Sequence, residues 1–270
     1  MWRDRLALLG LIGILLILAV TLLAPWLAPA DPLVIDYEVI LQPPGPVHPF
    51  GTDDLGRDVL SRVMWGGRQS LRTAVVASIV GLAGGLLLGL SAGFRGSTLD
   101  NVLQRVLEIY LAFPFILFLL SIVAILGPGQ GTILIAASIA LIPSYTRLVR
   151  GSVLSVRNLD YILASRALGA SDTRIIVRHV LPNVLPTVIV YVTLGVGGII
   201  LAAAGLSYLG LGVQPPTPEW GAMLNDGRTY IRSAWWMSVF PGLAIFLTVL
   251  CVNLLGDGLR EALDPRQRSL

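Results

Sequence analysis

Six long apolar runs constrain this sequence more than any other feature. An α-helix needs about 20 mostly apolar residues to cross a hydrocarbon core of about 30 Å, and the chain is 55% hydrophobic but only 13% charged. The runs therefore predict an all-α integral membrane protein with a bundle of six transmembrane helices. They lie at about residues 6–27, 73–94, 102–126, 132–149, 184–211 and 238–256.

The first run also has the features of a secretory signal peptide. Ala28-Pro29-Ala30 resembles the small-residue site at which such peptides are cleaved. However, the apolar part of a signal peptide is about 7–15 residues long, whereas this run is longer and further apolar runs follow it. We therefore expect an uncleaved first helix.

The distribution of arginine predicts the orientation of the helices. All 19 basic residues are arginine, and with the N-terminus in the cytoplasm thirteen of them lie on the cytoplasmic side. Excess positive charge marks the cytoplasmic loops of membrane proteins. We therefore expect both termini and a loop at about 150–183 in the cytoplasm, with 1–5 as a cytoplasmic tail and 6–270 as one transmembrane domain. Because the arginines follow membrane sidedness and form no single basic stripe, we expect no binding to nucleic acid.

Several kinds of chemistry are excluded by residues that the chain lacks. Without lysine it cannot hold the phosphate-binding loop G-x-x-x-x-G-K-[ST] or form a lysine Schiff base. Its single cysteine, Cys251, excludes an internal disulfide and a cysteine-based metal site. Asp53, Asp54 and Asp58 lack the twelve-residue ligand pattern of a calcium loop. We therefore expect no catalytic, cofactor-binding or metal site in this chain.

Special residues within the runs predict how the helices pack. Glycine recurs at every fourth position of the second run, which makes a smooth ridge for close helix contact. Pro114 and Pro143 each remove a backbone hydrogen bond, so they interrupt the third and fourth runs. Arg105 and Glu108 lie three residues apart, which favours a structural ion pair. The helix-packing ridge consists of Gly81, Gly85, Gly89 and Gly93.

Two longer segments are expected on the external side. In residues 29–72 the apolar residues recur at helical spacing from Asp58 onward, which predicts an amphipathic helix in the membrane interface, capped by Thr52 or Asp53. Residues 212–237 are too polar to lie in lipid, and they suit an idle loop and a docking surface equally well. The candidates for the interfacial aromatic belt are Trp220, Trp235 and Trp236.

The segment YILASRALGASDTRIIVRHVLPN, residues 161–183, is far more polar than its surroundings. Its periodicity predicts two short amphipathic helices. Gly169 is expected to end the first in a left-handed conformation, and Ser171 or Asp172 to cap the second.

The charge pattern of the same segment points to contact with another protein. Arg174 and Arg178 lie one helical turn apart, where like charges repel, so an acidic partner is expected to face them. An amphipathic helix in a groove is a common way for one protein to hold another. The alternative is a loop that lies in water or adsorbs to lipid.

This segment resembles the cytoplasmic loop of binding-protein-dependent ABC importer permeases. The family pattern is E-A-A, three residues, G, nine residues, then two residues and L-P. Here Leu163 replaces the glutamate and Ser165 the second alanine, and His179 stands at an apolar position, while the spacing is kept. The resemblance assigns an ATPase-coupling role to Leu163, Ala164, Ser165, Arg166, Gly169, Arg174, Arg178, His179, Leu181 and Pro182.

Three further stretches resemble the second permease subunit of the dipeptide, oligopeptide and nickel branch of this family. They are HPFGTDDLGRDVLSRVMWGGRQSL, PEWGAMLNDGR and FPGLAIFLTVLCVNLLGDGLREALDPR. The resemblance implies a permease of the bacterial plasma (inner) membrane that pairs with a second, homologous permease subunit. It also implies two ATPase subunits below, which carry the ATP and magnesium, and an extracytoplasmic substrate-binding protein above.

Dipeptides or oligopeptides are the cargo that this branch favours, with nickel, glutathione or another small solute as alternatives. A stand-alone secondary carrier is the second functional class, and it would show inverted repeats and a mid-membrane ion site. A membrane enzyme is the third, but the chain has only two histidines, His48 and His179, on opposite sides. No sequence pattern marks the residues of a substrate path.

Overall fold

The computed structural model describes residues 5–96 and 98–263. In that part of the chain the regular structure is helical, apart from one isolated β-bridge between Thr52 and Asp58. Arg3, Arg266 and Arg268, which are expected in the cytoplasm, lie outside the described residues. The α-helices are α1 (Arg5–Leu22), α2 (Ala24–Leu27), α3 (Val59–Arg95), α4 (Thr98–Leu111), α5 (Phe115–Leu126), α6 (Gln130–Val156), α7 (Asp160–Ala167), α8 (Asp172–Ile175), α9 (Leu181–Tyr208), α10 (Trp220–Gly227) and α11 (Trp236–Leu263).

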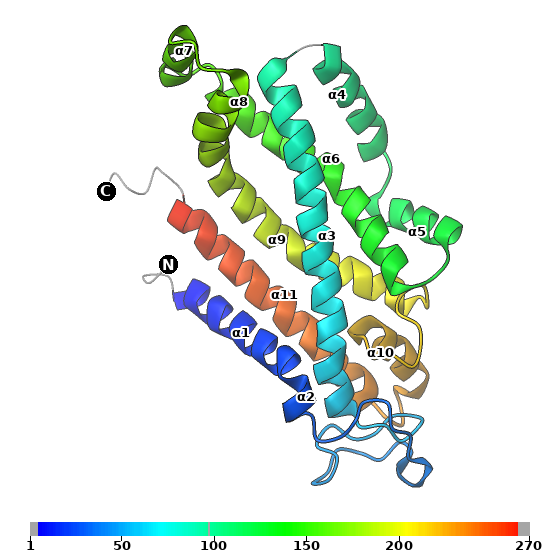
Figure 1. The fold of residues 1–270 in the computed structure, drawn as a ribbon. Coiled ribbons are helices and arrows are strands. Elements are labelled where there is room, and N and C mark those ends of the chain that lie inside the picture. Colours follow the sequence, from blue (N-terminus) through cyan, green and yellow to red (C-terminus); the bar gives the residue numbers. More distant parts are fainter. Residues whose placement is uncertain (1–4, 97, 264–270) are drawn as a thin grey trace.

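The long helices form a bundle whose two ends differ (Figure 1). Helix α3 packs along α6, and α11 lies between α1 and α9. Helices α7 and α8 lie at one end of the bundle, called the loop end here. Helix α2, residues 28–58 and α10 lie toward the other end, called the opposite end.

The predicted fold class, an all-α membrane protein, is confirmed. Within the described residues, five helical runs are long and apolar enough to cross a membrane, and a bent helix pair raises the number to as many as six. Apolar side chains cover much of the outside of these helices, as in a protein surrounded by lipid or by partner subunits.

The third apolar run is broken into two helices. Helices α4 and α5 meet at an angle of 87°, so the interruption expected at Pro114 within the run 102–126 is a sharp bend between two helices. The break falls at Pro114, which occupies the N-cap position of α5. Proline lacks an N–H and disfavours the helical conformation of the residue before it, which explains the end of α4 at this point. Helix α6, in contrast, runs through Pro143.

The amphipathic helix expected in the membrane interface is not a separate element. Residues 59–72 are the first turns of α3, which continues without a break for 37 residues. The expected cap at Thr52 or Asp53 is also wrong, since Asp58 caps α3 by accepting hydrogen bonds from the N–H and hydroxyl of Ser61, both at 2.7 Å. Only Asp58 directly precedes the first helical residue, as an N-cap must.

The glycine ridge of α3 lies against α6, one glycine opposite each turn. A β-carbon at Gly81 would lie 2.6 Å from Cβ of Leu141, and one at Gly89 would lie 2.7 Å from Cβ of Val149. Such distances are far below van der Waals contact, so only glycine allows this approach of the two helices. The α6 residues that face Gly81, Gly85, Gly89 and Gly93 in turn are Leu141, Tyr145, Val149 and Val153.

Two of the three tryptophans expected in an aromatic belt are buried in the protein. The indole N–H of Trp220 donates to the carbonyl oxygen of Val63 at 2.8 Å. The indole N–H of Trp236 donates to the carbonyl oxygen of Thr52 at 2.9 Å. Trp220 thereby attaches α10 to α3, and Trp236 attaches the start of α11 to the 28–58 segment. Trp235, in contrast, is exposed.

Candidate functional site

Helix α7 begins the polar segment at the loop end and stops at a left-handed glycine. Gly169 has a φ of +82°. Its N–H donates to the carbonyl oxygen of Arg166 at 3.0 Å, and the N–H of Ala170 donates to the carbonyl oxygen of Ser165 at 3.1 Å. This pair of bonds is the Schellman arrangement, which closes a helix and turns the chain. The predicted left-handed end at Gly169 is confirmed.

The chain then starts a second helix at Ser171, one of the two predicted caps. The Ser171 hydroxyl accepts a hydrogen bond from the N–H of Arg174 at 3.4 Å. The expected boundary between this helix and the fifth apolar run is absent, because α8 passes through a π-helical turn, Ile176–Val180, into α9. Residues Asp172–Tyr208 thus form one helical run of 37 residues.

The π-helical turn explains why the helix survives the proline that follows it. Pro182 has no N–H, and its ring would press on the preceding turn of a regular α-helix. In the structure the N–H of Leu181 donates to the carbonyl oxygen of Ile176, five residues back. This wider turn carries the helix past Pro182.

Three apolar side chains anchor the polar segment to the bundle. Ile162 of α7, Ile175 of α8 and Val180 of the π-helical turn are fully buried. They share one apolar cluster with the ends of α3 and α6. The anchor holds α7 and α8 at a fixed position relative to the membrane helices. The α3 and α6 members of the cluster are Phe94, Val149 and Val153.

The other face of the segment leaves large apolar side chains in contact with solvent. Leu168, at the tip of the turn, is 88% exposed, and Leu163, at the position of the family glutamate, is 46% exposed. Arg174 and Arg178 are also exposed, and neither forms an ion pair within the described residues. An anchored helix with exposed apolar and cationic side chains suits a docking surface.

The two small departures from the family pattern lie next to each other. The Ser165 hydroxyl is 3.5 Å from Nε2 of His179 and donates to the carbonyl oxygen of Tyr161 at 2.8 Å. The ring centroids of Tyr161 and His179 are 6.3 Å apart. Serine and histidine therefore link α7 to the π-helical turn. The family's alanine and apolar residue would offer no polar atoms for this contact.

Arginines fasten helices to one another toward the loop end of the bundle. The guanidinium of Arg150 in α6 donates two hydrogen bonds to the Asp100 carboxylate of α4, at 2.6 and 2.7 Å. Arg157 donates to the carbonyl oxygen of Gly93, at the end of α3, at 2.9 Å. These contacts join residues 50 and 64 positions apart, and no local sequence pattern indicates them. The expected pair of Arg105 and Glu108 forms at 3.1 Å, with both side chains exposed.

A buried network at the opposite end holds the 28–58 segment to α3. The Asp53 carboxylate accepts a hydrogen bond from Nε of Arg57 at 2.7 Å and lies 3.3 Å from Nε of Arg62. The Asp58 carboxylate lies 3.0 Å from Nδ1 of His48. These side chains are paired inside the protein, which gives the segment a fixed shape.

Asp226 of α10 lies beside this network, close enough to feel the charges of Arg62 and Asp53. Burial raises the pKa of its carboxyl, and the charge of the nearby Arg62 opposes that shift. Glu219, which caps α10, accepts hydrogen bonds from the hydroxyl of Ser70 at 2.8 Å and from the N–H of Ala222 at 2.9 Å. Helix α10 is thus a packed part of the bundle.

Comparison with known proteins assigns the chain to a family. Residues 85–269 match the binding-protein-dependent transport system inner membrane components, and residues 1–44 match the N-terminal transmembrane domain of oligopeptide transport permease C. The di/tripeptide transport system permease protein DppC of Pseudomonas aeruginosa is 46% identical over 273 residues, which is 99% of this chain and 90% of the relative. The glutathione transport system permease protein GsiD of Escherichia coli is 45% identical over 265 residues, 98% of this chain and 88% of the relative.

Solved structures show the same fold at low sequence identity. A chain of the MetNI methionine ABC transporter, in an inward-facing conformation, has a TM-score of 0.60 and 22% identity, covering 75% of this chain and 96% of that chain. A chain of an amino acid ABC transporter has a TM-score of 0.56 and 15% identity, covering 77% of this chain and 94% of that chain. The protein is a multi-pass component of the inner membrane, and the family to which it belongs is that of the binding-protein-dependent transport system inner membrane components, in the branch of DppC-like permeases.

Proposed function

We propose that this permease moves short peptides, with dipeptides and tripeptides as the main cargo. The proposal rests on two relatives of almost equal similarity, one named for di/tripeptide transport and one for glutathione transport. Glutathione is itself a tripeptide, so both names describe short, zwitterionic or anionic peptides. Nickel or another small solute is the alternative cargo.

The driving force is proposed to come from partner chains. A homologous second permease completes the pathway, an extracytoplasmic binding protein delivers the cargo, and two ATPase subunits bind ATP and magnesium. The single observation that carries the coupling proposal is the polar segment, which is anchored by buried Ile162 and Ile175 yet leaves Leu168 88% exposed. On this proposal α7 fits a cleft of an ATPase subunit, and Arg174 and Arg178 face acidic groups there.

On this proposal the loop end faces the cytoplasm, and so do the N-terminal end of α1 and the C-terminal end of α11. The arginine distribution supports the same orientation, because most arginines of the described residues lie toward that end of the bundle. The 28–58 segment and α10 then face the binding protein.

Uptake by the reconstituted complex tests the proposal. The permease, its partner permease and the ATPases are placed in proteoliposomes with the binding protein, and ATP-dependent uptake of labelled dialanine, glutathione and nickel is compared. We expect peptide uptake that requires ATP and the binding protein, and no uptake by this chain alone. Uptake by the chain alone would exclude the coupled mechanism, whereas ATP-dependent uptake of nickel without peptide would exclude the peptide cargo only.

A further inference from the structure

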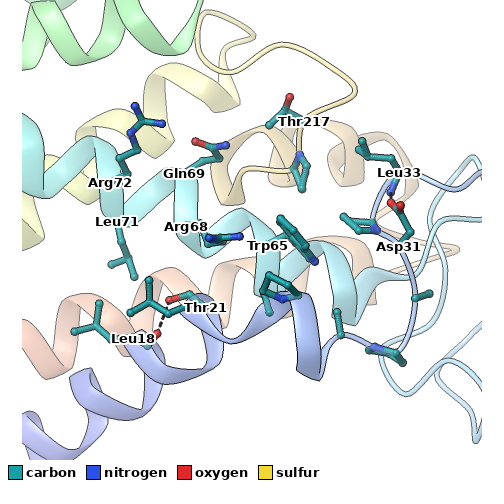
Figure 2. A pocket seen from close by; sticks show the side chains of 18 of the residues that line it. Leu18, Thr21, Asp31, Leu33, Trp65, Arg68, Gln69, Leu71, Arg72 and Thr217 are labelled. Carbon is teal, nitrogen blue, oxygen red and sulfur yellow. Dashed lines mark hydrogen bonds between the residues drawn. The ribbon is translucent and has the colours of Figure 1, made fainter.

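A large pocket lies beside α3, between α1 and the loop that precedes α10. It has a volume of about 1080 Å³. Figure 2 shows α3 across its middle, with Leu18 and Thr21 of α1 on one side and Thr217 on the other. The pocket lies toward the opposite end of the bundle, away from α7 and α8.

Two arginines of α3 give the pocket an unbalanced positive charge. Arg68 and Arg72 lie one helical turn apart and line it together, and neither forms an ion pair or hydrogen bond in the described part of the chain. The Arg68 guanidinium lies 5.0 Å from the ring centroid of Trp65. Like charges at this spacing repel each other, so an anion between them would relieve the repulsion.

The single acidic residue that lines the pocket does not neutralise the positive charge of the two arginines. Asp31 is the one carboxylate among the lining residues, and it accepts a hydrogen bond from the N–H of Leu33 at 2.8 Å. The charged groups of the pocket are therefore two guanidiniums and one carboxylate, a net charge of +1. A phosphodiester carries one negative charge and matches it.

The pocket also changes from polar to apolar along α3, in the direction of the membrane interior. Arg72 directly precedes the apolar stretch of the helix, and Val75 and Val76 continue the pocket wall beyond it. Leu18 and Leu22 of α1 form the facing apolar wall. Since guanidiniums and a tryptophan at the end of a membrane helix mark the level of the lipid headgroups, the two parts of the pocket match the two parts of a phospholipid.

We propose that this pocket binds a phospholipid, with Arg68 and Arg72 on the phosphodiester and an acyl chain between Leu18, Leu22 and Val75. Arginine donates to phosphate oxygens through several N–H groups in a fixed geometry. The lipid fills the space between α1 and α3 and ties the first helix to the bundle. In the orientation proposed above, it comes from the outer leaflet.

Photo-cross-linking in the assembled transporter tests this site. The complex is reconstituted in nanodiscs that contain a phosphatidylglycerol or phosphatidylethanolamine with a diazirine in one acyl chain, and the cross-linked peptides are mapped by mass spectrometry. We expect labelling at Leu18–Leu22 and around Val75. The double variant Arg68→Gln, Arg72→Gln should lower the yield at least about tenfold, because charge-assisted hydrogen bonds to the phosphate are lost.

Two controls separate this site from general contact with the bilayer. Arg232→Gln, which removes an exposed arginine of the opposite end outside the pocket, should leave the yield unchanged. A diazirine glycolipid without phosphate should label the pocket at the level of the double glutamine variant. Equal labelling by glycolipid and phospholipid, or an unchanged yield in the double variant, would overturn the proposal. So would absence of lipid labelling in the assembled complex, since a protein segment would then fill the pocket.

Discussion

At the scale of single residues, Gly169 is constrained by its backbone conformation and not by the space around it. A β-carbon at this position would meet no atom within 4 Å, so a side chain is not excluded by space. The φ of +82° is the constraint, because left-handed backbone costs other residues roughly 1–2 kcal/mol. The position therefore tests backbone conformation separately from packing.

A graded series at Gly169 should follow the tolerance for left-handed backbone. Gly169→Asn should keep most ATP-driven uptake, Gly169→Val should lose much of it, and Gly169→Pro should abolish it, since proline fixes φ near −65°. Uptake in proteoliposomes measures the series, and the amount of permease in the membrane fraction should stay constant. Full uptake by Gly169→Pro would show that the turn after α7 is not needed for coupling.

Asp226 gives a pH-dependent prediction at the opposite end. Burial raises the pKa of its carboxyl, so the folded protein binds the proton more tightly than the unfolded chain does. The stabilisation by the neutral carboxyl is complete below the ordinary pKa of 3.8 and is lost as the pH rises through the raised pKa. Asp226→Asn should therefore unfold at a higher temperature than the wild type at pH 7, with a difference that shrinks toward pH 4.

Thermal unfolding of the purified complex, followed at several pH values, measures this effect. Glu38→Gln, at an exposed carboxylate of the same end, is the matched control and should show no such dependence. A less stable Asp226→Asn at pH 7 would mean that the attraction of Arg62 outweighs burial.

At the scale of helices, the apolar runs and the glycine spacing could be predicted from sequence because both depend on local periodicity. The 87° bend between α4 and α5 could not, because proline allows a break without setting its angle. The joining of α8 to α9 was missed because a π-helical turn has no sequence signature of its own. The burial of Trp220 and Trp236 was missed because their hydrogen-bond partners lie 157 and 184 residues away.

The α3–α6 contact makes a prediction about this pair of helices. At Gly85 a β-carbon would overlap the side chain and backbone of Tyr145, so Gly85→Ala should force the helices apart and destabilise the protein by about 1–3 kcal/mol. Gly151, also in a helix, has open space around it, and Gly151→Ala should be neutral or stabilise by up to about 1 kcal/mol. Thermal unfolding of the two variants in one detergent provides the comparison. Equal effects on stability would contradict the close packing of the glycine ridge of α3 on α6.

At the scale of the whole molecule, the two ends of the bundle differ in how their polar and apolar side chains are placed. Buried charges at the opposite end hold the 28–58 segment in one shape, while the loop end leaves Leu168, Arg174 and Arg178 exposed. The candidate docking residues were predictable from the motif at 161–183, but their buried anchor was not. The anchor depends on tertiary contacts of α7 and α8 with α3 and α6, which no local sequence pattern indicates.

Cross-linking tests whether the exposed loop end meets an ATPase subunit. In a Cys251→Ala background, Leu168→Cys should cross-link to the ATPase, with a yield that changes on addition of ATP. Ile162→Cys is the matched control in the same helix, and because Ile162 is fully buried it should not react. Identical yields with and without nucleotide would indicate a static attachment.

The continuous run from Asp172 to Tyr208 has a mechanical consequence. At 1.5 Å per residue, its 37 residues make a rod about 55 Å long. A tilt of about 10° around one end of this rod would move the other end by roughly 10 Å. Because the run stays helical through its π-helical turn, movement of partner ATPases at the loop end, as proposed above, would be passed along one continuous element toward the opposite end of the bundle.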